Sequence, residues 1–273
     1  MAIYPTNVLA LCAGVGGLDL GVMLAVPGAS WVCHVEGEGY VAAVLAARME
    51  EGLLDQAPIW DNVATFDGKP WRGIVHTVTG GYPCQPFSHA GKMLADKDPR
   101  HLWPHVRRIV EEVQPQVCFF ENVAHHLHLG FEQVHDDLQA MGFRVAAGVF
   151  SAEEVGASHK RERLFIMAHA GGKEPHRLSG RERADVLEAR NLCRSLDKRG
   201  RFAFPPCPLD REAWAKVDRS LLPTVESEVH GVADGLAHRV DRLRACGNGV
   251  LPLVAAHAWL TLDEALNHGK EHS

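Results

Sequence analysis

Val8-Leu9-Ala10-Leu11-Cys12-Ala13-Gly14-Val15-Gly16-Gly17 is the stretch of sequence that decides the fold. Its first half is a short continuous apolar run, which is typical of a strand buried on both faces. The glycines then end the strand, and residues 18–26 carry the apolar spacing of a helix that Pro27-Gly28 closes. A buried strand, a glycine turn and a helix predict the first unit of an α/β sheet.

The same alternation continues to about residue 170. Further strands are expected at residues 31–35, 74–79, 116–120, 143–150 and 164–168, and helices at 40–49, 101–113 and 131–141. Short turns between strands and helices predict a doubly wound, mostly parallel sheet covered on both faces. In such a sheet the binding crevice lies at the carboxyl ends of the strands.

The composition changes after Gly171-Gly172, where an arginine-rich stretch with little apolar periodicity begins. Helical apolar spacing returns between residues 251 and 266, as in a helix that docks on the first unit. We therefore expect a main domain at residues 1–170, a small separate unit at 171–238 and a returning segment at 239–273.

The bulk composition is that of a globular protein, with 273 residues, 46% hydrophobic and 23% charged. No apolar run reaches the length of a membrane span, and the first residues lack a signal peptide, so a cytoplasmic protein is expected. The seven cysteines form no Cys-x-x-Cys pair, which disfavours a disulfide framework or zinc ribbon. His125-His126-x-His128 lacks a helical zinc spacing, and no metal is expected.

Charge is unevenly distributed along the chain. Residues 159–220 hold fifteen Lys and Arg against nine Asp and Glu, about +6, within a chain of net charge −6. A basic face that contacts phosphates would give this pattern, and so would a solvated helix face.

Two features at predicted strand ends indicate a ligand site. Gly14-x-Gly16-Gly17 opens a helix, and Glu36 ends the next strand, where a carboxylate can bind two ribose hydroxyls. A nucleoside-containing cofactor fits these residues, although a tight turn in any α/β protein would also contain such glycines.

Cys84 and Glu121 each follow a predicted strand, which places them at one edge of the sheet. Cys84 stands in Pro83-Cys84-Gln85-Pro86-Phe87-Ser88, and Glu121-Asn122-Val123 comes directly after the apolar run 117–120. Most cysteines are small core residues, and most such glutamates cap helices or lie at the surface. Together, however, a thiolate and a carboxylic acid are what conjugate addition to a pyrimidine requires.

These motifs, in this order, resemble those of the cytosine-5 DNA methyltransferases. The resemblance covers residues 8–170 and 240–260 and rests on the following stretches: residues 11–17, Glu36, residues 80–88, residues 121–123, the Gln-x-Arg-x-Arg-like residues 159–163, and Gly247-Asn248-Gly249-Val250. It implies a Rossmann-like S-adenosylmethionine-dependent fold in which residues 171–238 are a small target-recognition domain.

The resemblance also implies roles for the catalytic residues. Cys84 adds to carbon 6 of a flipped-out cytosine in double-stranded DNA, and Glu121 protonates ring nitrogen 3. Arg161 and Arg163 stabilise the base oxygen and the charge that develops. S-adenosylmethionine supplies the methyl group to carbon 5, without a metal. We expect a monomer.

Cofactor and DNA contacts follow from the same resemblance. The expected cofactor residues are Cys12, Ala13, Gly14, Val15, Gly16, Gly17, Glu36, Asn62, Val63, Pro83, Trp103, Asn248 and Val250. The expected DNA contacts are Gln85, Ser88 and Arg100 in a mobile loop, and Arg177, Arg181 and Arg183 in the recognition unit. The chain departs from the family pattern at Cys12, usually Phe, at Asn62, usually Asp, at Ser158, commonly Pro, and at His159, usually Gln.

Three other functions fit parts of the pattern. A tRNA cytosine-5 methyltransferase shares the chemistry, and a catalytically silent DNA-binding relative would share the fold. A generic α/β oxidoreductase would explain the glycine loop alone. The small recognition unit predicts a short or degenerate target, and by analogy the compact chain favours a phage or orphan enzyme over a restriction-modification partner.

Overall fold

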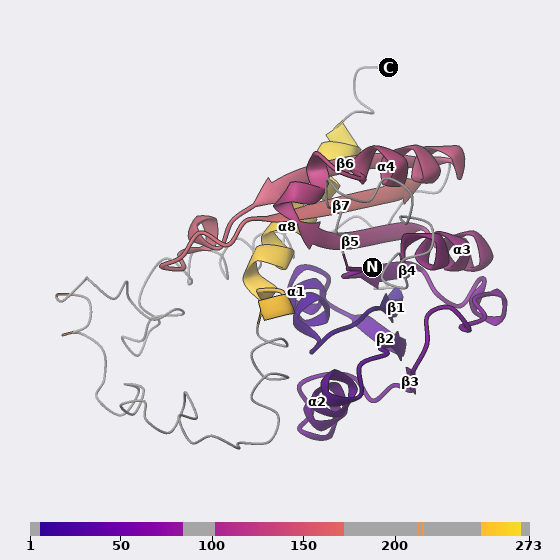
Figure 1. Cartoon of the computed structure of the whole chain (residues 1–273), viewed down its shortest axis with the longest axis horizontal. Helices are drawn as coiled ribbons and strands as arrows, with labels where there is room; N and C mark the ends of the chain where they lie inside the picture. The colour runs from indigo at the N-terminus through magenta and orange to yellow at the C-terminus, as the bar shows by residue number, and fades with distance from the viewer. Residues whose placement is uncertain (1–5, 84–101, 172–211, 213–214, 216–246, 269–273) are drawn as a thin grey trace, which may run out of the picture.

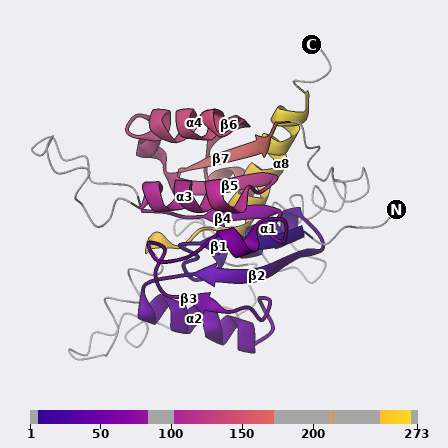
Figure 2. The same ribbon diagram turned by 90° about the vertical axis from the view of Figure 1, so that its right-hand side faces the viewer.

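A seven-stranded sheet runs through the computed structural model, which describes residues 6–83, 102–171, 212, 215 and 247–268 (Figure 1). The strands are β1 (Thr6–Leu11), β2 (Ala29–Val35), β3 (Ile59–Trp60), β4 (Thr77–Gly80), β5 (Val117–Val123), β6 (Phe143–Phe150) and β7 (Arg163–Ala170). Their order is β3-β2-β1-β4-β5-β7-β6, which Figure 2 shows as a stack from β3 to β6. The strands from β3 to β5 are parallel, whereas β7 is antiparallel to both of its neighbours.

Helices cover both faces of the sheet. They are α1 (Gly17–Ala25), α2 (Gly39–Glu50), α3 (Trp103–Val113), α4 (Phe131–Ala140) and α8 (Pro252–His268), with short 3-10 helices η1 (Lys69–Trp71), η3 (Ala124–Leu127) and η4 (Glu153–Val155). Side chains of β1 alternate between two cores: Val8 faces α1 and α8, and Leu9 faces α3 and α4. The expected doubly wound sheet is therefore confirmed.

The C-terminal helix α8 lies against α1 and the β6–β7 pair. Gly21 permits this close approach, since a Cβ there would lie 2.5 Å from the Cβ of Ala255. Arg144 on β6 donates to the carbonyl of Leu266 at 2.6 Å, near the end of α8. The segment after residue 247 thus completes the face that α1 begins.

Two local expectations from the sequence are wrong. The β4 strand begins at Thr77, three residues later than expected, and Glu121 lies within β5 rather than after it. The β5 strand continues to Val123 because its last three residues pair with residues 163–165 of β7. Of the unit expected at 171–238, only residues 171, 212 and 215 lie within the described residues. No helix among the described residues is long and apolar enough to cross a membrane.

Candidate active site

A cavity of about 630 Å³ opens at the carboxyl ends of β1, β2, β4 and β5. Its wall is formed by the loop after β1, the end of β2, the residues after β3, the ends of β4 and β5, Arg163, and residues 247–250. The cavity therefore lies at the carboxyl ends of the strands, where the strand pattern predicts the binding crevice. Its lining residues come from both the beginning and the end of the sequence.

The glycine loop after β1 has a backbone that turns sharply. Cys12, Gly14 and Gly16 all have positive φ, at 49°, 59° and 79°. Arg48 of α2 fixes the loop, since its Nη1 donates to the carbonyl of Val15 at 2.7 Å. Glycines adopt this conformation without strain at two of the three positions, whereas Cys12 is a non-glycine residue in the left-handed region.

Glu36 lies at the end of β2 with its carboxylate directed at the glycine loop. The amide of Gly14 donates to Oε2 at 2.8 Å, and the amide of Glu38 donates to Oε1 at 2.8 Å. Each oxygen accepts one backbone hydrogen bond and retains capacity for another. A carboxylate fixed in this way beside a cavity is suited to accept hydrogen bonds from sugar hydroxyls.

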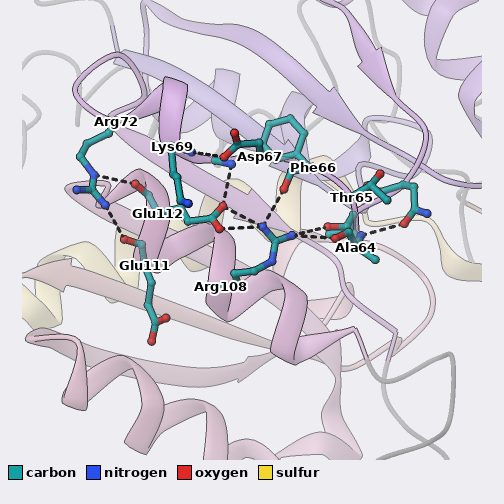
Figure 3. Close-up of polar contacts among 12 residues, drawn as sticks. Ala64, Thr65, Phe66, Asp67, Lys69, Arg72, Arg108, Glu111 and Glu112 are labelled. Atoms are coloured by element: carbon teal, nitrogen blue, oxygen red, sulfur yellow. Dashed lines mark hydrogen bonds and ion pairs between the residues drawn. The ribbon is translucent and has the colours of Figure 1, made fainter.

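The loop that carries Asn62 and Val63 is fastened to α3. Arg108 donates to the carbonyl of Val63 at 3.0 Å and to that of Phe66 at 2.8 Å, and it forms an ion pair with Glu112 (Figure 3). The Asn62 Oδ1 accepts from the amide of Ala64 at 2.9 Å, which closes a local turn. Arg108 thus holds the cavity-lining residues Asn62 and Val63 in place, although α3 itself does not line the cavity.

Most of the expected cofactor residues line this cavity. They are Cys12, Ala13, Gly14, Val15, Gly17, Glu36, Asn62, Val63, Pro83, Asn248 and Val250. Gly16 and Trp103 do not line it. The Trp103 side chain is buried, where its indole donates to Asp137 Oδ2 at 2.8 Å and its ring packs 5.3 Å from that of Tyr82. The glycine loop and the Glu36 acceptor fit an adenosine-containing cofactor.

Glu121 and Arg163 form an ion pair in the wall of the same cavity. The Arg163 Nε lies 3.0 Å from Glu121 Oε1, and Glu121 is only 7% exposed. Burial raises the pKa of Glu121 to about 7, although Arg163 and then Arg161 act to lower it. A carboxyl group with this pKa can both donate and accept a proton near neutral pH.

Arg161 does not share this arrangement with Arg163. Its Nη2 donates to the carbonyls of Gly247, at 2.8 Å, and Gly249, at 2.5 Å. It is absent from the cavity wall, whereas Arg163 is part of it. The two arginines that the sequence treats as equivalent therefore contact different parts of the protein.

Asn122 fixes the backbone that leads to Cys84. Its Nδ2 donates to the carbonyl of Tyr82 at 3.0 Å, and the Tyr82 hydroxyl lies 3.2 Å from Nε2 of buried His126. Pro83 is exposed in the cavity wall. The expected nucleophile Cys84 and the expected DNA contacts Gln85, Ser88, Arg100, Arg177, Arg181 and Arg183 lie outside the described residues.

The three described cysteines are poor nucleophiles. Burial raises the pKa of Cys33 to about 11, and burial followed by the charge of Glu36 raises that of Cys12 to about 12. Burial also raises the pKa of Cys118 far above its usual range. A thiol with such a pKa is almost entirely protonated at neutral pH. Within this part of the chain no cluster of His, Cys, Asp or Glu could hold a metal.

Sequence reasoning missed the supports of the site. Arg48 and Arg108 have no signal in the sequence, because each acts on a carbonyl far away along the chain. Asn122 could have been found, since it stands in the same three-residue motif as Glu121.

The fold is a Rossmann-like α/β fold that is shared with Dnmt2 methyltransferases of known structure. A Dnmt2 mutant from Spodoptera frugiperda superimposes with a TM-score of 0.53 at 20% identity, covering 64% of this chain and 53% of that one. The Dnmt2 methyltransferase of S. pombe gives 0.52 at 21% identity, covering 63% and 53%. At this identity the likeness shows the fold alone.

The chain belongs to the C-5 cytosine-specific DNA methylase family, whose model matches residues 6–196. It is 32% identical over 164 residues to the type II methyltransferase M.NgoMIV of Neisseria gonorrhoeae, covering 59% of this chain and 50% of that protein. It is 32% identical over 185 residues to M.BspRI of Lysinibacillus sphaericus, covering 59% and 44%. The chain spans about half the length of these relatives.

Proposed function

We propose that this protein transfers a methyl group from S-adenosylmethionine to carbon 5 of cytosine in double-stranded DNA. The observation that carries the proposal is the buried Glu121–Arg163 ion pair, 3.0 Å long, in the wall of the cavity that also contains Glu36 and the glycine loop. Family membership supports the same reaction. A cofactor site and an acid in one cavity are what this chemistry needs.

The reaction begins when the Cys84 sulfur, as a thiolate, forms a bond to carbon 6 of a cytosine that has left the base stack. The displaced electron pair makes carbon 5 nucleophilic, and a proton on ring nitrogen 3 limits the negative charge on the ring. S-adenosylmethionine, when bound, would supply the methyl group from its sulfonium sulfur and would leave as S-adenosylhomocysteine. Solvent then takes the proton on carbon 5, and the returning electron pair breaks the sulfur–carbon 6 bond and regenerates the thiolate. The proton on ring nitrogen 3 returns to the group that supplied it.

Glu121 is the group that delivers the proton to ring nitrogen 3. Its pKa of about 7, raised by burial, leaves a large protonated fraction at neutral pH. Arg163 orients the carboxyl group through its Nε and places positive charge where the base oxygen gains electron density. Asn122 holds the Tyr82 carbonyl, two residues before the nucleophile.

Glu36 and the loop after β1 are the parts of this chain that would hold the cofactor. Glu36 would accept from the ribose hydroxyls, and the backbone of the loop after β1 would lie along the ligand. Asp61 also lines the cavity beside Asn62, so a charged acceptor is available although the usual Asp position holds an amide.

DNA contacts belong to residues beyond this cavity. We assign the catalytic role to residues 1–170 with 239–273, and target recognition to residues 171–238. Gln85, Ser88, Arg100, Arg177, Arg181 and Arg183 would contact the DNA, most of them at phosphates. The protein would act on DNA in the bacterial cytoplasm as a monomer.

The test is methyl transfer by the purified full chain. Tritiated S-adenosylmethionine is offered with unmethylated duplex DNA or with tRNA, and bisulfite sequencing locates the product. We expect 5-methylcytosine in DNA, abolished by Cys84→Ser and retained by Cys33→Ala, which removes a buried thiol outside the cavity wall.

If tritium is incorporated into tRNA and not into DNA, the substrate is RNA and the proposed DNA substrate is wrong. Binding of DNA without transfer to either nucleic acid would favour a silent relative. Full activity of Cys84→Ser would refute the covalent mechanism.

A further inference from the structure

Arg161 joins two segments that are far apart in the sequence. Its guanidinium donates to the carbonyls of Gly247 and Gly249, which lie 86 and 88 residues further along the chain. These carbonyls belong to the stretch that re-enters the described structure just before α8. Arg161 therefore fixes the point at which the chain returns to the sheet.

The backbone explains why Arg163 forms the ion pair with Glu121 and Arg161 does not, although the charge of Arg161 also acts on that carboxyl group. Arg161 has a φ of 37°, in the left-handed region that non-glycine residues rarely adopt, and it stands two residues before β7 begins. In a regular strand, residues two apart point to the same side. The left-handed turn breaks this rule, so only Arg163 reaches Glu121.

The stretch that Arg161 holds is part of the cavity wall. Residues 247–250 all line the cavity, and they are confined on the other side by the start of α1. A Cβ on Gly17 would lie 2.3 Å from the carbonyl oxygen of Val250. The wall is thus packed against α1 on one side and held by two charge-assisted hydrogen bonds at its beginning.

We propose that Arg161 is a positioning residue of the cofactor pocket, which acts by holding residues 247–250 in place and does not act on the base. The proposal rests on S-adenosylmethionine being the cofactor of this cavity. The two arginines of one motif would then have different tasks. Arg163 would act on Glu121 and on the cytosine, and Arg161 would hold residues 247–250 in the wall of the cofactor pocket.

The test compares ligand binding with turnover in matched arginine variants of the full chain. Binding of S-adenosylhomocysteine is measured by calorimetry, and the rate of methyl transfer is measured at saturating cofactor. Arg161→Ala keeps a side chain at the left-handed position, so the backbone strain is common to variant and wild type. Arg144→Ala is the control, because it removes an arginine that holds the far end of α8.

We expect Arg161→Ala to weaken S-adenosylhomocysteine binding about tenfold, which is about 1.4 kcal/mol. The KM for S-adenosylmethionine should rise with little change in kcat. Arg161→Lys, which can donate to one carbonyl, should restore part of the affinity. Arg163→Ala should bind the ligand as the wild type does and lose turnover, and Arg144→Ala should lower the melting temperature without weakening the ligand.

Two results would overturn the proposal. One is unchanged ligand affinity in Arg161→Ala together with a kcat as low as that of Arg163→Ala, which would place Arg161 at the base. The other is an equal loss of affinity in Arg144→Ala, which would show general loosening. If Arg161→Ala does not fold, Arg161→Gln and Arg161→Lys provide the same comparison. A wild type that binds the ligand but transfers no methyl group refutes the proposed function and leaves this binding test intact.

Discussion

Replacing Glu121 by Gln should change how the stability of the protein depends on pH. The Glu121 carboxyl is 7% exposed, and burial raises its pKa from 4.5 to about 7 in the folded protein. The folded state therefore keeps a proton that the unfolded chain releases at a lower pH. Because the folded state binds more protons between pH 4.5 and 7, stability must fall as pH rises through this window.

The magnitude follows from the size of the shift. A shift from 4.5 to about 7 corresponds to about 3 kcal/mol in total. Between pH 5 and pH 8 the expected loss of stability from this one group is about 2.5 kcal/mol. Glutamine does not titrate, so Glu121→Gln lacks this loss. All other titrating groups contribute nearly equally to both proteins and cancel in the comparison.

Urea unfolding followed by circular dichroism at pH 5 and pH 8 gives the four free energies of unfolding that the comparison needs. The stability loss between the two pH values should be about 2–3 kcal/mol larger in the wild type than in Glu121→Gln. Glu111→Gln removes an exposed carboxylate of α3 and should behave as the wild type does. Equal pH dependence in wild type and Glu121→Gln, within about 1 kcal/mol, would refute the raised pKa.

Three further predictions concern the supports of the site. Glu36→Ala should weaken S-adenosylhomocysteine binding about tenfold or more, because the ribose hydroxyls lose their proposed acceptor and the amides of Gly14 and Glu38 lose theirs; calorimetry showing native affinity would exclude Glu36 as a ligand residue. Gly21→Ala should lower the free energy of unfolding by about 2 kcal/mol because its Cβ would overlap Ala255, and an unchanged melting curve would mean that α8 does not pack on α1. Asn122→Ala should reduce methyl transfer while ligand affinity stays native, because the Tyr82 carbonyl loses its donor; a parallel loss of affinity would contradict this.

The sequence was sufficient to predict the order of the main elements. Apolar runs such as residues 8–12 indicate strands because both faces of the sheet are covered, and helix patterns between them require parallel connections. The short β3 strand could not be predicted, since Ile59–Trp60 is too short to carry a period and exists only through its pairing with His34 and Val35. The β4 strand begins only at Thr77 because the amides of Ile74 and Val75 donate to the carbonyl of Trp71, in the turn that follows η1.

The contact between Glu121 and Arg163 could not be predicted from the sequence, because it depends on the pairing of β5 with β7. Glu121 and Arg163 meet because Val123 pairs with Arg163 across antiparallel strands, and Glu121 is two residues from Val123 on the same face. Directly opposite residues share a face, so the two side chains are diagonal neighbours. A sequence motif gives the residue types, but it does not give the register in which β5 pairs with β7.

The same geometry separates the two arginines that the motif places side by side. Alternation along a strand would bring Arg161 to the face of Arg163, but the strand starts only at Arg163 and the backbone at Arg161 is left-handed. A side chain released from the strand in this way can reach the carbonyls of Gly247 and Gly249, from a part of the chain that sequence spacing places far away. Residue types at a strand end therefore predict a catalytic role, whereas the different contacts of Arg161 and Arg163 depend on one backbone torsion that the sequence does not reveal.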